Sequence, residues 1–273
     1  MPRTQPIKYL IQIFIKKEYL MGLVQSTGLC YSFFMLKSVI IGGNEYPATA
    51  ALVQASLDTE KNVMVAVSDN EGEVQTPGNG ACSYAWHKTS PVSTRAMLLE
   101  SENKFEGLDC AFIVFDAQVF SSKYNALSLE NISRGNDEML VSMEYLTYEI
   151  LKRFEINKKG LLCFVLNPVS ALSDITRNPR LMHDSVPLAP LAAAAQSGFR
   201  SFAENIAATS TISKLYKVLL VEQGLESRED LANWLLPFAS EYFDSKKNYN
   251  AKESVKWMHI GAKLPSSHSF FSR

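Results

Sequence analysis

The 273-residue chain has few cysteines, and they lie far apart. Cys30, Cys82, Cys110 and Cys163 form no C-x-x-C pair and no cluster with histidine. Structural zinc needs closely spaced Cys and His ligands, and small secreted scaffolds need many disulfides, so this pattern argues against both. We therefore expect no metal site, and buried or incidental thiols in a reducing compartment.

An excess of charge of one sign is also missing. The 27 basic and 28 acidic side chains give a net charge of -1, which argues against the positive field that a nucleic-acid binder presents to phosphates. No uninterrupted apolar run reaches the ~18 residues of a membrane-spanning helix, so no integral membrane span is expected. With 47% hydrophobic residues the chain can still bury a core, which excludes a disordered or collagen-like protein.

Acidic residues are absent from the start of the chain. Arg3, Lys8, Lys16 and Lys17 all precede the first acid, Glu18, and apolar residues lie among them. A basic, amphipathic, acid-poor start is typical of a targeting segment, but a clean apolar run with a small-residue cleavage pattern is lacking. Two interpretations remain for residues 1–34: an organelle-targeting segment, or an extension outside the fold of a cytoplasmic protein.

From Lys37 onward the chain alternates short apolar runs with longer stretches of helical period, the pattern of a parallel sheet covered on both faces. A prior of about 150 residues per domain permits one large α/β domain or two small ones, but no linker is evident. We predict one Rossmann-like, doubly wound α/β domain with three α/β/α layers over residues 35–264, followed by a tail, 265–273. The predicted strands are 38–41, 62–67, 95–99, 108–115, 160–166, 217–221 and 255–260; the predicted helices are 49–57, 137–154, 188–208 and 228–241, and 70–91 is mostly loop.

The order of these segments resembles the short-chain dehydrogenase/reductase (SDR) superfamily. Residues 232–240 (ANWLLPFAS) are similar to the family's penultimate helix, and 217–224 (KVLLVEQG) to the strand and loop that usually end in Pro-Gly. Residues 257–262 (WMHIGA) resemble its closing strand. The resemblance implies the Rossmann fold, NAD(P) as cofactor and hydride transfer as chemistry.

The glycine-rich turn implied by the resemblance, TGxxxGxG, is poorly kept. Such glycines let the backbone and a helix N-terminus approach the cofactor pyrophosphate. Aligned on Gly42, the later glycines fall on Tyr46 and Ala48, and Tyr46 places a bulky side chain where phosphate would lie. The cofactor-binding candidates are Gly42, Gly43, Asn44, Tyr46 and Asp69. Asp69 would accept an adenosine ribose hydroxyl, or it simply forms a turn in Ser68-Asp69-Asn70-Glu71-Gly72.

The catalytic residues that the resemblance implies are missing. In the family a tyrosine is the general acid and a lysine four residues later lowers its pKa, because a phenol with a pKa near 10 transfers protons poorly at neutral pH. These positions fall on Ala189 and Ala193, and residues 181–204 contain no Tyr or Lys at all. The family's serine corresponds to Ser170 only with a small displacement, and its helix asparagine is lost near residues 141–143.

A few residues could restore chemistry near this edge of the predicted sheet. The family's NNAG motif corresponds to residues 115–118 (FDAQ), of which only the alanine is kept. Asp116, within this segment, would either point toward the nicotinamide region or cap the next helix. His183 and Asp184 precede the Ala-rich helix and, with Ser170 or Ser173, suggest a hydrolase triad. No G-x-S-x-G nucleophile elbow supports that triad.

These absences favour a pseudo-oxidoreductase that acts as a non-catalytic binding or regulatory subunit. The alternatives are an NAD(P)-dependent oxidoreductase with a non-standard active site, using groups near Asp116, Ser170 and His183, and a dinucleotide sensor without turnover. The resemblance further implies a homo-oligomer, or a hetero-oligomer with an intact homologue, through helices near 138–154 and 189–208. The alanines of the second helix would allow close approach of a partner helix.

Overall fold

The computed structural model describes residues 36–42, 47–68, 81–178, 187–224, 226–245 and 251–263. Six of the candidate residues, Gly43, Asn44, Tyr46, Asp69, His183 and Asp184, lie outside the described residues. The predicted extension 1–34 and tail 265–273 lie outside them as well, so the proposed domain bounds stay a prediction.

Six parallel strands form one sheet in the order β3-β2-β1-β4-β5-β6. The strands are β1 (Ser38–Gly42), β2 (Asn62–Ser68), β3 (Ala81–Trp86), β4 (Cys110–Asp116), β5 (Leu161–Asn167) and β6 (Lys217–Glu222). The strand order reverses between β1 and β4, which is the place where ligands bind in open α/β sheets. The predicted doubly wound parallel sheet is confirmed.

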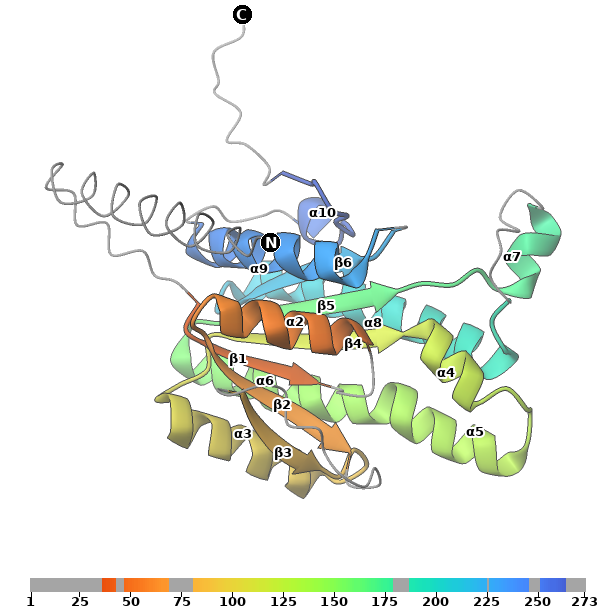
Figure 1. Ribbon diagram of the computed structural model, residues 1–273, viewed down its shortest axis with the longest axis horizontal. Coiled ribbons are helices and arrows are strands. Elements are labelled where there is room, and N and C mark those ends of the chain that lie inside the picture. Colours follow the sequence, from red (N-terminus) through yellow and green to blue (C-terminus); the bar gives the residue numbers. More distant parts are fainter. Residues whose placement is uncertain are drawn as a thin grey trace, which may run out of the picture. The chain divides into compact units, whose positions relative to one another are not determined.

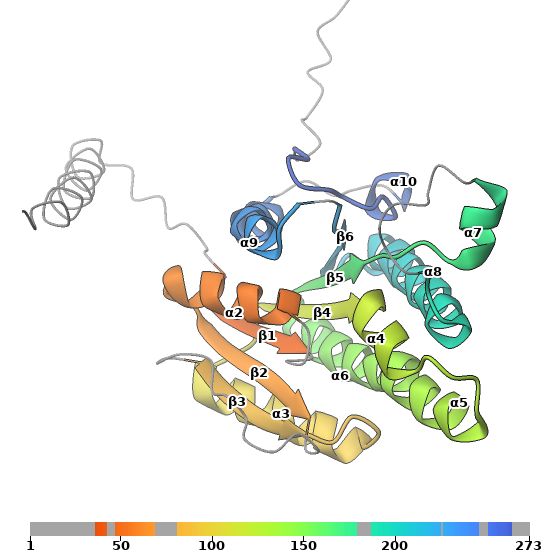
Figure 2. The same ribbon diagram turned by 45° about the vertical axis from the view of Figure 1, so that its right-hand side comes forward.

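Helices cover both faces of this sheet (Figures 1 and 2). One face carries α2 (Pro47–Asp58) and α9 (Arg228–Asp244), which pack on each other, and the other carries α3 (Pro91–Phe105), α6 (Ser142–Asn157) and α8 (Pro190–Ser213). Shorter elements are α4 (Ala117–Lys123), α5 (Leu129–Asn136), the π-helical turn η1 (Asp137–Val141), α7 (Leu172–Arg177) and α10 (Ala251–Ser254). The result is the predicted three-layer α/β/α arrangement.

The central strands read as apolar runs because helices bury both of their sides. Every residue of β4 is buried, and Phe115 packs on Phe199 of α8 with ring centroids 4.9 Å apart. Phe164 of β5 meets the same ring from the neighbouring strand, at 5.7 Å. This aromatic cluster fixes α8 against the sheet, and with it the edge where the candidate catalytic positions lie.

Three of the predicted elements are wrong. Residues 95–99 are not a strand but part of α3, whose start is marked by Pro91 and by the Ser90 hydroxyl that accepts a hydrogen bond from the Ser93 amide. The third strand is instead β3, inside the stretch predicted to be loop. Residues 255–260 form no strand either, since only Met258 bridges to Val221.

The missed strand β3 and the wrongly predicted strand 255–260 both lie where pairing in the sheet is incomplete. β3 is an edge strand that pairs only with β2 among the described strands, and four of its six residues are half-buried. Its sequence, ACSYAW, therefore lacks the continuous apolar run of a central strand. Met258 keeps two backbone hydrogen bonds to β6, 2.8 and 2.9 Å long, without extending into a ladder.

Candidate functional site

The neighbouring strands β4 and β5 run side by side (Figure 1), and their register brings Asp116 and Asn167 together at the carboxyl ends. Asp116 is fully buried and is the N-cap of α4, where its Oδ1 accepts hydrogen bonds of 3.1 Å from the amides of Gln118 and Val119. Its Oδ2 accepts a bond of 3.1 Å from Asn167 Nδ2. Both carboxylate oxygens are thus engaged by the protein itself, so the geometry is that of a helix cap.

Ser170, Ala189 and Ala193 also come together. The Leu188 amide donates to the Ser170 carbonyl at 3.3 Å, next to a bridge between Ala171 and Leu188. Ala189 is the N-cap of α8, and its amide donates to Ser121 Oγ at 2.8 Å. Ala193 lies one turn further on. The positions that would hold the tyrosine and lysine are therefore at the start of α8, and both present half-buried methyl groups that carry no proton.

A glutamine that the sequence did not single out fixes the adjoining loop. Gln196 of α8 pairs reciprocally with the backbone of Val169, accepting from its amide at 3.0 Å and donating to its carbonyl at 3.1 Å. Such a two-bond clamp holds the segment after β5 on α8. At this edge the side chains of Asp116, Ser121 and Gln196 all hydrogen-bond to backbone groups, and these bonds hold the backbone in place.

Little space is left between Gly42, at the end of β1, and helix α6. A Cβ on Gly42 would lie 2.8 Å from Leu146 Cδ2 of α6, so the missing side chain accommodates Leu146. The cavity bounded by Gly42, Trp86, Lys88 and Met143 measures about 10 Å³, room for one water.

Lys88, Lys123 and Glu138 form a charged cluster beside this cavity. Lys88 is only 8% exposed, and Lys123 Nζ lies 2.8 Å from Glu138 Oε2. Burial lowers the pKa of Lys88 to about 8, while the charge of Glu138 acts in the opposite direction. Burial alone would raise the pKa of Glu138, but hydrogen bonding to Lys123 and Tyr124 and the charge of Lys88 hold it below its ordinary value.

Tyr124 adjoins Glu138 of this cluster, so a tyrosine and lysines lie near one another, yet their electrostatics are opposite to those of the catalytic pair that the resemblance implies. Burial and the neighbouring Glu138 carboxylate raise the pKa of Tyr124 above its ordinary value, so its phenol is a poorer acid. Sequence reasoning missed this cluster because no motif spacing joins Lys88, Lys123 and Glu138. The one structural signal is that Glu138 lies in η1, since π-helical turns are rare and frequent at functional sites.

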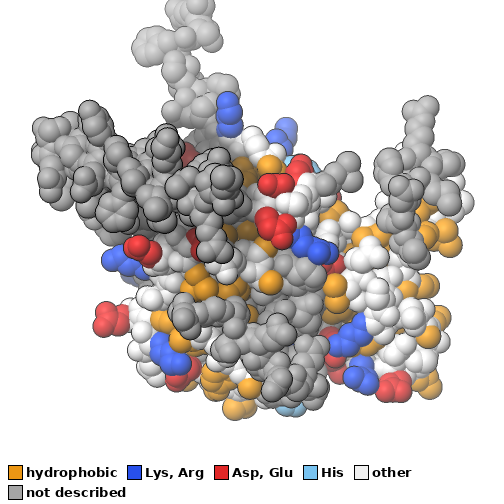
Figure 3. Space-filling view, in the orientation of Figure 1, with side chains coloured by type: hydrophobic (Ala, Val, Ile, Leu, Met, Phe, Trp, Pro, Cys, Tyr) orange, Lys and Arg blue, Asp and Glu red, His pale blue; other side chains and the backbone are white. Residues whose placement is uncertain are grey.

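The surface carries both signs of charge. Figure 3 shows Lys and Arg side chains interspersed with Asp and Glu over the described part of this face. Within the described residues, no helix is both long and apolar enough to cross a bilayer. The same part of the chain holds no group of three His, Cys, Asp or Glu side chains arranged for a metal ion.

Comparison with solved structures finds the same fold in short-chain dehydrogenases and reductases. An NADH-dependent reductase A1-R′ complexed with NAD is 12% identical and superposes with a TM-score of 0.60 over 85% of this chain and 98% of that one. A short-chain dehydrogenase from Leptospira borgpetersenii with bound NAD+ is 14% identical, with a TM-score of 0.58 over 83% and 92%. A 3-ketoacyl-(acyl-carrier-protein) reductase from Brucella melitensis complexed with NADH is 12% identical, with a TM-score of 0.56 over 82% and 96%. At such identities the likeness is one of fold, and it confirms the SDR-like fold expected from the sequence.

Sequence comparison adds less. No family model matches the chain. A protein of Treponema pallidum (strain Nichols), described as uncharacterized, is 33% identical over 86 residues, which are 32% of this chain and 39% of that protein. The match thus spans about two fifths of that relative's length.

Proposed function

We propose that this SDR-like protein does not carry out hydride transfer and acts as a non-catalytic binding or regulatory subunit. The observation that carries the proposal is the pair Ala189 and Ala193 at the start of α8, where the family resemblance requires a tyrosine and a lysine. Sliding the alignment does not restore them, because residues 181–204 contain neither residue type.

The chemistry explains why this loss matters. Hydride addition to a carbonyl leaves an alkoxide that a nearby acid must protonate, and a tyrosine does so near neutral pH only when a neighbouring cation lowers its pKa. An alanine methyl group can do neither. Tyr124, the nearby tyrosine of the charged cluster, has its pKa shifted upward, which supports the same conclusion.

Two alternatives remain, an oxidoreductase with a non-standard site and a dinucleotide sensor. Both require NAD(P) to bind, and the three solved structures compared above contain NAD or NADH. The Asp116 carboxylate, engaged by three protein donors, gives neither alternative an available base.

The partner of such a subunit would bind helices α6 and α8, as a second copy or an intact homologue. Tyr148 of α6 is 62% exposed, which is high for a tyrosine in the middle of a long helix. On α8, Ala194, Ser197 and Ser201 are exposed small side chains that permit close approach of another helix. These surfaces support the oligomer predicted from the sequence.

A dinucleotide titration tests the proposal. The purified protein is titrated with NADH and NADPH to 1 mM while cofactor fluorescence and melting temperature are followed, with the Leptospira borgpetersenii dehydrogenase as positive control. A Kd of about 10 μM would stabilise the fold by about 2.7 kcal/mol at that concentration and raise Tm by about 5–11 °C. We expect no such shift and no cofactor oxidation with a panel of carbonyl substrates.

The outcomes separate the three hypotheses. Cofactor binding with turnover would establish the oxidoreductase and refute our proposal. Cofactor binding without turnover would establish the sensor. The absence of both, together with a defined oligomer in sedimentation equilibrium, is the result that the proposal requires.

A further inference from the structure

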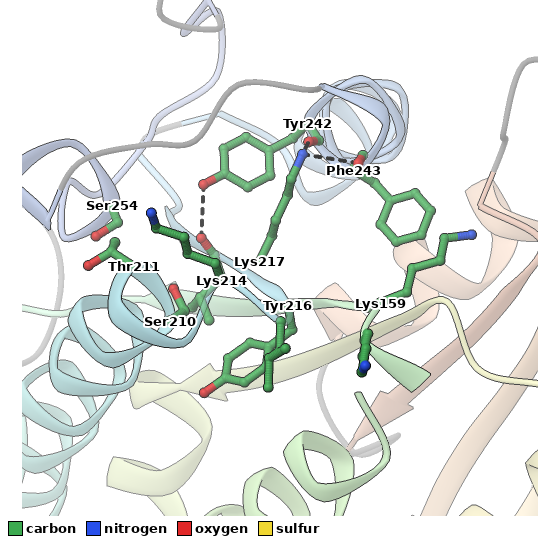
Figure 4. A pocket seen from close by; sticks show the side chains of 13 residues that line it. Lys159, Ser210, Thr211, Lys214, Tyr216, Lys217, Tyr242, Phe243 and Ser254 are labelled. Atoms are coloured by element: carbon green, nitrogen blue, oxygen red, sulfur yellow. Dashed lines mark hydrogen bonds between the residues drawn. The ribbon is translucent and has the colours of Figure 1, made fainter. Parts of the chain in front are cut away.

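A second pocket lies at the opposite, amino edge of the sheet, where β5 and β6 begin and the helices α6, α8 and α9 end. Its volume is about 180 Å³. Among the described residues, four lysines line it, Lys158, Lys159, Lys214 and Lys217, and no carboxylate does. We refer to it as the amino-edge pocket; Figure 4 shows its side chains.

One of the four lysines has a structural role. Lys217 Nζ donates to the carbonyls of Tyr242 at 2.7 Å and Phe243 at 3.0 Å, and also to that of Ser245. Tyr242 and Phe243 lie in the last turn of α9, and Ser245 directly follows the helix. The carbonyls at a helix C-terminus need donors from outside, because no helical amide follows to reach them. The three ammonium protons of Lys217 are thereby used, so this lysine is excluded from ligand binding.

The other three lysines are differently placed. Lys159 reaches over the Phe243 ring, 4.6 Å from its centroid, and lies 3.5 Å from Asp109. Lys158 and Lys214 are the C-caps of α6 and α8, both with left-handed backbone, and are exposed. Among the described residues, no carboxylate comes within ion-pair distance of either ammonium. Neither lysine is tied to the helix ends by its side chain in that part of the chain.

The polar groups of the pocket surround a common space. Figure 4 draws Lys214 on the same side as the hydroxyls of Thr211 and Ser254, with Lys159 on the opposite side. A space of about 180 Å³ is smaller than the roughly 300–1,000 Å³ that holds drug-sized molecules, so an occupant would be small. Ammonium groups on several sides of a small space suit an anion with several oxygens, because each N–H donates a charge-assisted hydrogen bond.

We propose that the amino-edge pocket binds a small phosphate-bearing anion of the phosphomonoester or pyrophosphate class, held by Lys158 and Lys214. Lys159 adds charge from the far wall, and Lys217 keeps the end of α9 in place behind the site. Because this pocket lies at the opposite edge of the sheet from Ala189 and Ala193, the proposal is independent of whether the protein catalyses hydride transfer.

The test is calorimetric titration of the full chain with inorganic phosphate and with pyrophosphate, in buffers matched in ionic strength with sodium chloride. We expect pyrophosphate to bind with a Kd below about 1 mM and more tightly than phosphate. The double variant Lys158→Gln/Lys214→Gln should weaken pyrophosphate binding by about tenfold or more, since each of the two exposed charge pairs that it removes contributes about threefold. Lys152→Gln, an exposed lysine of α6 outside this pocket, is the matched control and should bind as the wild type does.

Several results would overturn the proposal. One is an absence of pyrophosphate binding by the wild type, and another is equal weakening by Lys152→Gln, which would reflect net charge alone. Binding to anionic phospholipid vesicles without binding to soluble pyrophosphate would assign the pocket to a lipid surface instead. Melting temperatures verify that the variants fold, and the two single variants, each expected to weaken binding about threefold or more, provide a second measure if the double variant is unstable.

Discussion

Replacing Asp116 tests whether this buried carboxylate holds the fold or performs chemistry. Asp116→Ala removes the cap of α4, which costs about 0.5–2 kcal/mol, and leaves the Asn167 amide without its acceptor, which costs about 1–3 kcal/mol. We expect a loss of about 3 kcal/mol in the free energy of unfolding, or about 6–12 °C in Tm for a domain of this size. Urea unfolding followed by circular dichroism measures it.

A second variant separates the cap from the charge. Asp116→Asn retains one oxygen that can accept from the amides of Gln118 and Val119, but its amide group would face the Asn167 amide, so two donors would meet unless one side chain turns over. We expect a cost of about 1–2 kcal/mol, and a double variant with Asn167→Ala that loses less than the sum of the two single losses. Unchanged stability in Asp116→Ala, combined with a changed response to NADH, would refute the capping role.

Three further sites, two of them with a control variant, give sharp expectations. Burial lowers the pKa of Lys88 from 10.5 to about 8, which corresponds to about 3 kcal/mol. Because the unfolded chain keeps the Lys88 proton to higher pH, the stability of the wild type should rise relative to that of Lys88→Met between pH 8 and 10.5. Urea unfolding at several pH values measures this, and parallel curves for the two proteins would contradict it. Gly160→Ala would place a Cβ 2.1 Å from the buried ring of Phe154 and should lower the free energy of unfolding by about 3 kcal/mol or more. Its control, Gly107→Ala, has a φ of +142° but no atom within 4 Å of the new Cβ, and should cost about 1 kcal/mol in the same assay. Tyr148→Glu should dissociate an oligomer formed through α6, while Val92→Glu on α3 should not; sedimentation equilibrium that shows the same mass for both would refute that interface.

The central strands and most helices could be predicted because burial leaves a mark on the sequence itself. A strand covered on both faces, such as β4 or β5, must be apolar along its whole length, and a long helix must repeat its apolar face. The edge strand β3 left no such mark, since its residues become a strand only by pairing with β2. The converse holds for residues 95–99, whose short apolar patch is typical of a strand although it lies within helix α3. The signal for the helix is its start, the cap Ser90 followed by Pro91.

The candidate site divides in the same way. An absence can be read from sequence alone, because no arrangement of residues 181–204 creates a tyrosine or lysine that the segment lacks. What Asp116 does could not be read, since cap and catalyst are the same residue type at the end of the same strand. Only its three hydrogen-bond donors, one of them from the neighbouring strand, distinguish the two.

The sequence by itself therefore determined the fold class, the central strands and the missing proton-transfer residues. Tertiary structure alone decided which side chains share a space: Lys88 with Glu138 beside the switch point, and the lysines from the ends of α6 and α8 and the start of β6 around the amino-edge pocket. The physical reason is that chain order fixes local conformation through hydrophobic period and helix caps, whereas charges meet through contacts between elements 15 to 60 residues apart, which no local pattern records.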